Sequence, residues 1–164
     1  MRLTEIILIL LISNLTFGQE KYVGIYNSYF SQSIQLKSDS TFVHKYRFDL
    51  ASSWTTGKWK VEKDTIYLTT EFVMDTLNIR NSENKIIRDS LVISSDRESN
   101  RIEKIEHLSY LLSSGGQNRL KPPNKIYWKR NKLYRITDNG KIEKTRKVEG
   151  IKKKYKTYFR KENE

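Results

Sequence analysis

No cysteine occurs among the 164 residues of this chain. The absence excludes disulfides, a thiol nucleophile, a redox pair, a lipid-anchored cysteine and every zinc site built on thiolates. Only two histidines are present, His44 and His107. Because a metal centre needs several convergent ligands, we predict neither a bound metal nor another cofactor.

The chain also lacks the short motifs of common enzymes. It contains no Gly-x-Ser-x-Gly, no His-Glu-x-x-His, no phosphate-binding glycine loop and no calcium loop. The serine pair Ser52-Ser53 has no candidate base near it in the sequence. We therefore assign no catalytic residue and expect a protein that is not an enzyme; an enzyme ranks third among the functions considered.

A long apolar run is missing except at the amino terminus. The aliphatic stretch Ile6–Ile12 follows the basic start Met1-Arg2 and precedes the small residues of Thr16–Gly18. This arrangement is typical of a signal peptide, and the run is shorter than the roughly 20 residues that span a bilayer. The sequence predicts export to a periplasm or extracellular space, cleavage near Gly18-Gln19, and no transmembrane span in the mature form.

Residues 19–164 show the alternation of a single domain built mainly from β-strands. In Thr41–Phe48 every second residue carries a ring, which predicts a strand with Phe42, His44, Tyr46 and Phe48 facing inward. Ala51–Trp54 is interpreted as a loop. Gly57–Glu62 and Thr65–Glu71 form the next antiparallel pair, joined by a turn at Lys63-Asp64.

One segment has the period of a helix instead. Ile102, Ile105, Leu108 and Leu112 recur at steps of three and four residues. Ser95 and Glu98 have the spacing of a capping box, and Gly115-Gly116 supplies a stop. We predict a helix near residues 96–113.

The last part of the chain returns to strands after a loop at Pro122-Pro123, the only prolines. Asn139-Gly140 predicts a type I′ turn between Lys132–Thr137 and Lys141–Val148. Nine or ten antiparallel strands result, and they must close into a barrel or fold into a two-sheet sandwich. We favour a single lipocalin-like barrel with one helix.

Several short patterns resemble a known family. Gly24-x-Tyr26, Ile34-x-Leu36, Thr41-Phe42, Gly57-x-Trp59, Ile66-x-Leu68 and the hairpin Leu133–Ile142 occur in the order seen in lipocalin-like barrels of exported bacterial proteins. The pattern is similar to the amino-terminal domain of NlpE-type envelope lipoproteins, which are linked to copper homeostasis and surface sensing. That family carries a Cys-x-x-Cys pair and a lipid-attached cysteine. This chain has neither, so the resemblance implies a fold and no copper or thiol chemistry.

Aromatic residues are abundant, with ten Tyr, three Trp and six Phe. In a barrel they could line a cavity for a small apolar ligand, or they could simply fill it. His44 is either a hydrogen-bonded core residue or a group that binds a metal or moves a proton. The candidate ligand-binding residues inside the barrel are Tyr26, His44, Tyr46, Trp59, Tyr67 and Trp128.

Positive charge is concentrated in the last quarter of the chain. Residues 121–164 hold 16 of the 31 lysines and arginines and 5 of the 19 acidic residues. This quarter could bind an anionic envelope component or membrane surface, or be a solvated edge that discourages aggregation; export argues against nucleic acid. The candidate polyanion-binding residues are Lys144, Arg146, Lys147, Lys152, Lys153, Lys154 and Lys156. We expect a binding or accessory protein of the bacterial cell envelope, with polyanion binding as the alternative.

Overall fold

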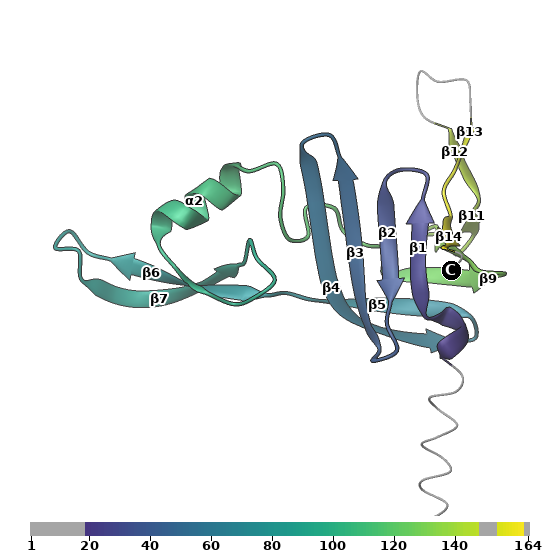
Figure 1. Ribbon diagram of the computed structural model, residues 1–164, viewed down its shortest axis with the longest axis horizontal. Helices are drawn as coiled ribbons and strands as arrows, with labels where there is room; N and C mark the ends of the chain where they lie inside the picture. The colour runs from purple at the N-terminus through teal and green to yellow at the C-terminus, as the bar shows by residue number, and fades with distance from the viewer. Residues whose placement is uncertain (1–18, 148–153, 163–164) are drawn as a thin grey trace, which may run out of the picture.

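The computed structural model describes residues 19–147 and 154–162 (Figure 1). Eight antiparallel strands form a closed barrel, in the order β10, β14, β1, β2, β3, β4, β5 and β9, and β9 pairs with β10 to complete the circle. The predicted fold class is confirmed, with a barrel and not a sandwich. The predicted signal peptide lies outside the described residues.

The barrel strands are short apart from β4. Their bounds are β1 Gly24–Ser28, β2 Gln32–Leu36, β3 Thr41–Phe48, β4 Ala51–Glu62, β5 Thr65–Glu71, β9 Lys125–Lys129, β10 Lys132–Ile136 and β14 Phe159–Lys161. A 3₁₀ turn, η1 (Glu20–Tyr22), precedes β1. The loop predicted at Ala51–Trp54 is wrong, because β4 continues through it and pairs with β3 as far as Ala51.

Two tight turns set the register of the barrel. Lys63 and Asp64 join β4 to β5, and Arg130 and Asn131 join β9 to β10; all four residues have positive φ. Two such residues in succession make a type I′ turn, which matches the twist of the flanking strands. The turn predicted at Lys63-Asp64 is confirmed.

The Asn139-Gly140 hairpin differs from its prediction. Gly140 has positive φ (74°). Its amide donates to the Thr137 carbonyl, and the Thr137 amide donates to the Lys141 carbonyl. These bonds enclose three residues, the arrangement of a longer hairpin with a glycine bulge instead of a two-residue I′ turn. The predicted strand Lys141–Val148 is divided in two: β11 (Ile142–Glu143) pairs with β10, and β12 (Thr145–Lys147) pairs with β13 (Lys154–Lys156). Val148 lies outside the described residues.

One half of the barrel interior is filled by apolar side chains. The alternation in each strand directs them inward. Tyr22 of η1 packs against them at the end of the barrel opposite the turn between β3 and β4, which we call the closed end. This end is in the lower part of Figure 1. The core members are Tyr22, Tyr26, Ile34, Leu36, Phe42, Trp59, Ile66, Leu68, Ile126, Leu133 and Phe159. Burial of this set is the main stabilising contribution to the barrel.

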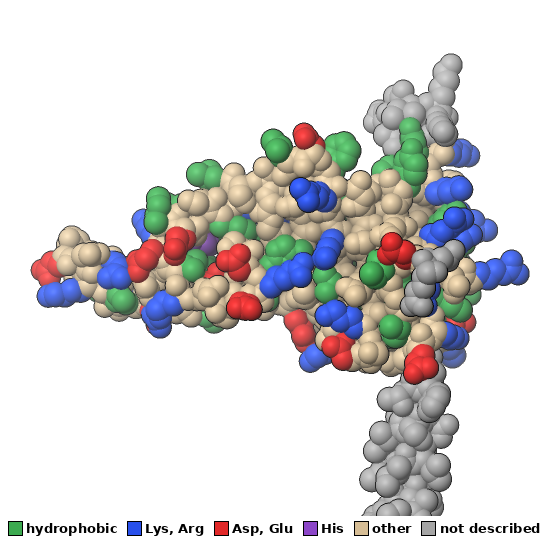
Figure 2. Space-filling model, in the orientation of Figure 1, with side chains coloured by type: hydrophobic (Ala, Val, Ile, Leu, Met, Phe, Trp, Pro, Cys, Tyr) green, Lys and Arg blue, Asp and Glu red, His purple; other side chains and the backbone are tan. Residues whose placement is uncertain are grey.

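An extension leaves the barrel after β5 and returns before β9. It contains β6 (Met74–Arg80), β7 (Ile86–Ile93), β8 (Arg101–Ile102) and helix α2 (Lys104–Leu112), and it lies to the left of the barrel in Figures 1 and 2. Along the part of the chain that the structure describes, no helix has the length and apolar character needed to span a membrane.

The predicted helix at residues 96–113 begins too early. Residues 99–102 are held against β6 instead: the Asn100 amide donates to the Asp75 carboxylate (2.8 Å), and β8 pairs in parallel with β6. The capping box is formed by Glu103 and Glu106, not by Ser95 and Glu98. The helix therefore begins after Glu103, eight residues later than the predicted capping residue Ser95.

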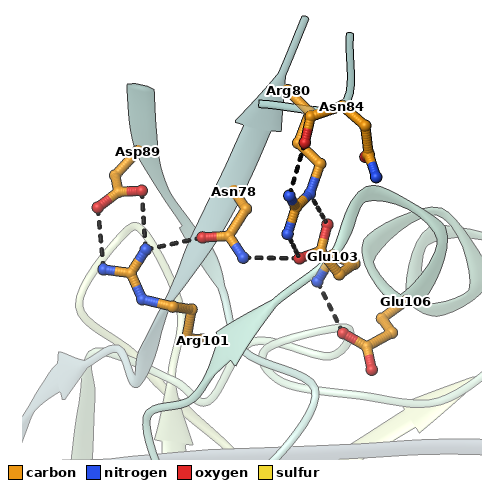
Figure 3. Close-up of polar contacts among 7 residues, drawn as sticks. All are labelled: Asn78, Arg80, Asn84, Asp89, Arg101, Glu103 and Glu106. Carbon is orange, nitrogen blue, oxygen red and sulfur yellow. Dashed lines mark hydrogen bonds and ion pairs between the residues drawn. The ribbon is translucent and has the colours of Figure 1, made fainter. Parts of the chain in front are cut away.

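Glu103 is the centre of a polar network that joins α2 to β6 (Figure 3). Arg80 donates to both its carboxylate oxygens, at 3.0 and 2.7 Å, and the Asn78 amide donates at 2.8 Å. Arg101 links Asn78 to Asp89 on β7. The hydrogen bonds from Arg80 and then Asn78 lower the pKa of Glu103 to about 2.

Replacing Glu103 by alanine is expected to loosen the extension and not the barrel. The change removes the Arg80 ion pair and the Asn78 hydrogen bond that hold the start of the helix to β6, so amide hydrogen exchange in α2 should accelerate about tenfold while β4 is unaffected. Because the folded pKa is depressed, this stabilisation is present above pH 4.5 and is lost as the pH falls toward 2. Equal acceleration in Glu83→Ala, which removes an exposed turn carboxylate, would contradict this role.

Candidate ligand-binding site

The interior of the barrel changes from apolar to polar toward the end where β3 meets β4, here called the mouth. On β3 the inward series runs from Phe42 to His44, and on β4 from Trp59 to Thr55 and Ser53. The polar side chains of His44, Thr55 and Ser53 are buried, as is Thr157. A polar layer therefore lies above the apolar core.

Arg135 is the charged member of this layer. It lies two residues after the buried Leu133 on β10, so the alternation of the strand directs it inward. Its Nη2 donates to Oε1 of Gln32 at 2.7 Å, and its guanidinium lies 5.5 Å from the centre of the Phe159 ring. Burial, and then repulsion from Arg146, lowers the pKa of Arg135.

No carboxylate of the described residues forms an ion pair with Arg135. Its cross-strand neighbour Glu143 is occupied by Arg146, whose Nε lies 3.0 Å from Oε1. The mouth therefore holds two guanidinium groups and one carboxylate, and its net charge is positive.

His44 is fully buried beside this arginine. Its Nε2 lies 3.4 Å from the same Gln32 oxygen, and its buried Nδ1 has no hydrogen bond of good geometry among the described residues. Burial, and then the charge of Arg135, lowers the pKa of His44 to about 4. The ring is neutral at pH 7, and Gln32 connects it to Arg135.

A hollow of about 650 Å³ opens above the polar layer, and we call it the mouth hollow. Rings form much of its wall, and Phe48 is 65% exposed there. Its lining residues are Ser28, Tyr29, Phe30, Ser31, Gln32, Tyr46, Phe48, Leu120, Arg135, Arg146 and Thr157. The inward prediction for Phe48 is wrong in one respect: the residue is in phase with Phe42 but lies at the rim, where no core covers it.

The structure separates the predicted ligand-binding residues. Tyr26 and Trp59 fill the core, where the Tyr26 hydroxyl donates to the Tyr22 carbonyl at 2.7 Å. Trp128 packs at the closed end, edge to face with Tyr22 at 5.1 Å. Of the six, Tyr46 lines the mouth hollow and His44 lies in the polar layer that includes Gln32.

Tyr67 does not face the interior at all. Its neighbours Ile66 and Leu68 are the buried residues of β5, so Tyr67 lies on the outer face, where the Lys60 ammonium is 5.5 Å from its ring centre. The inward prediction for Tyr67 is wrong, because its phase on β5 is opposite to that of Ile66 and Leu68.

The sequence interpretation missed Gln32 and Arg135 as site residues. Arg135 enters the sequence prediction only as part of the basic carboxyl-terminal quarter, although its phase with Leu133 indicates the inward face of its strand. Leu120 enters from the segment after α2, where its amide donates to the Ser53 hydroxyl at 2.8 Å. No local pattern predicts that long-range contact.

The predicted polyanion-binding residues lie near or on a small ribbon of β12 (Thr145–Lys147) and β13 (Lys154–Lys156). Lys147 and Lys154 are cross-strand partners, and Lys156 is opposite Thr145. Lys144 precedes the ribbon, while Arg146 turns toward Glu143 and the mouth. Lys152 and Lys153 lie outside the described residues.

Known proteins offer no guide to this arrangement. No family model, curated protein or solved structure matches this chain. The resemblance to NlpE-type lipoproteins stays a prediction. Among the residues described, no three His, Asp or Glu side chains gather into a group that could hold a metal ion.

Proposed function

We propose that this protein is an exported binding protein of the bacterial cell envelope and that the mouth hollow holds a small apolar molecule with one carboxylate. The observation that carries the proposal is Arg135, a half-buried guanidinium whose hydrogen-bond partner is the neutral amide of Gln32. A buried charge without a counter-charge is costly, and a ligand carboxylate would relieve that cost. The planar guanidinium is also suited to grip a carboxylate with two hydrogen bonds.

The wall of the mouth hollow supports an apolar body for this ligand. Tyr29, Phe30, Tyr46 and Phe48 surround a volume of about 650 Å³, within the range of pockets that hold small molecules. Exposed rings gain free energy when an apolar ligand removes them from water. The ligand's chain or ring would therefore lie against these side chains while its carboxylate reaches Arg135.

The charge of the mouth favours a monoanion. Glu143 forms an ion pair with Arg146, and its charge also acts on Arg135, so two guanidinium groups share one carboxylate and the described residues of the mouth keep a net positive charge. A second ligand carboxylate would meet the Glu143 carboxylate instead of a free cation. This arrangement separates the mouth from a polyanion site, which needs a series of cations.

Titration with decanoate and with decan-1-ol tests this proposal, since the two differ chiefly in the charged group. Decanoate should bind more tightly than decan-1-ol. Arg135→Gln should weaken decanoate binding by about thirtyfold and hardly change the affinity for decan-1-ol. Isothermal titration calorimetry measures both. Arg47→Gln is the matched control, because it removes one exposed positive charge from β3. Equal binding of acid and alcohol, or equal loss in both variants, would contradict the proposal.

A further inference from the structure

The outer face of β9, β10 and β14 carries two rows of side chains that run across the strands. Tyr127 and Tyr134 are directly opposite each other, and the rings of Tyr134 and Tyr158 are 5.4 Å apart. We call these three residues the tyrosine row. Beside it, Lys132 is opposite both Lys129 and Arg160, and these three form the cation row.

The cation row is an unusual arrangement for a solvated edge. Like charges directly opposite each other on neighbouring strands destabilise a sheet. None of the three cations forms an ion pair with a carboxylate of the described residues, although Lys58, Lys60 and Lys85 elsewhere on the molecule each do. A bound anion would turn this repulsion into attraction.

Two hollows extend the rows to either side. One of about 250 Å³ lies between the β9–β10 hairpin and Lys144, and another of about 460 Å³ lies between β14 and Lys156. Seven lysines and arginines line the two hollows together, against the single carboxylate of Glu162. Figure 2 shows Lys and Arg side chains gathered at this side of the molecule, on the right. The surface suits a long ligand and not a single ion.

The tyrosine rings are poorly placed to stack on nucleic-acid bases. The Tyr134 and Tyr158 planes are tilted by 48°, and the Lys132 ammonium lies 5.0 Å from the Tyr158 ring centre. A base-stacking platform needs open ring faces. Half-buried phenols beside ammonium groups instead offer hydroxyl and cation partners to a chain that bears both hydroxyl and carboxylate groups.

We propose that the tyrosine and cation rows bind a linear acidic polysaccharide that crosses β9, β10 and β14 on the outside of the barrel. Its carboxylates lie against Lys129, Lys132 and Arg160, and its sugar rings lie along the tyrosines. The contact lies on the outer face of the barrel, whereas the mouth hollow opens inside it around Arg135; Ser28 and Tyr29 line both the mouth hollow and the neighbouring hollow of about 460 Å³. Loss of one site is therefore expected to leave the other intact.

Binding of a fluorescently labelled polygalacturonate oligosaccharide, measured by anisotropy at about 50 mM salt, tests this inference. Lys132→Gln with Arg160→Gln should weaken binding by about tenfold or more. The matched control is Lys45→Gln with Arg47→Gln, which removes the same charge from β3, on the opposite wall of the barrel; it should change binding by less than about twofold. Tyr134→Leu should weaken binding without changing the charge.

Three outcomes would overturn the inference. Equal loss in both double variants would show that only total charge matters. Tighter binding of an oligodeoxynucleotide of equal charge would identify a nucleic-acid surface instead. Absence of binding to the polygalacturonate in the unaltered protein would remove the site altogether, whereas decanoate binding in the mouth would be untouched by that result.

Discussion

Replacing Trp59 by alanine is expected to lower the free energy of unfolding by about 3–5 kcal/mol. Trp59 is 3% exposed within the barrel core, and its indole Nε1 donates to the Lys37 carbonyl at 3.0 Å. The change creates a cavity between strands that close on one another. It also removes one of the two hydrogen bonds that the Lys37 carbonyl accepts, the other coming from the Ser40 amide. Urea denaturation followed by circular dichroism measures the loss.

Trp54→Ala is the control for Trp59, because it removes the same side chain from the same strand. Trp54 lies on the outer face of β4, is partly exposed, and has the Arg97 guanidinium 5.9 Å from its ring centre. We expect it to lose less than about 2 kcal/mol. Equal losses at the two positions would contradict an apolar core centred on the inward face of β4.

Acidification from pH 6.5 to pH 4 is expected to destabilise the protein by about 3 kcal/mol through His44 alone. The folded pKa of His44 is about 4 and its ordinary value is 6.5, so between these values the unfolded chain binds a proton that the folded chain refuses. Stability therefore falls as the pH falls through this window. Well below pH 4 both states are protonated and the contribution of His44 becomes constant.

His44→Gln should flatten this part of the stability curve, because glutamine does not titrate there. The measurement is a set of urea denaturations at half-unit steps of pH, compared with His107→Gln, which leaves His44 in place. A slope that persists in His44→Gln, or one that disappears in His107→Gln, would show that another group causes it.

The period of the strands predicts most of the barrel. Phe42 and His44 are buried as their phase requires, and so is Trp59. The period fails where an element ends: Phe48 continues the phase of β3 but lies beyond the core, and β4 begins earlier than its polar residues indicate. The alternation of residues along a strand indicates which face of the strand a residue lies on, but it does not indicate how deep the residue lies within the barrel.

The candidate site was predicted much less well than the barrel. Its central contact joins Gln32 on β2 to Arg135 on β10, more than one hundred positions along the chain. That contact exists only because the strands close into a circle, and no spacing in the sequence encodes the closure. The predicted start of the helix is wrong for a related reason, because long-range hydrogen bonds with residues of β6 hold Asn100 and Glu103 in place.

A crystal structure of the protein grown with decanoate tests the central claim most directly. The proposal predicts density in the mouth hollow, with the carboxylate within hydrogen-bond distance of the Arg135 guanidinium and the chain against Tyr46 and Phe48. An empty mouth hollow at a saturating decanoate concentration, or a ligand whose carboxylate points away from Arg135 into solvent, would contradict it.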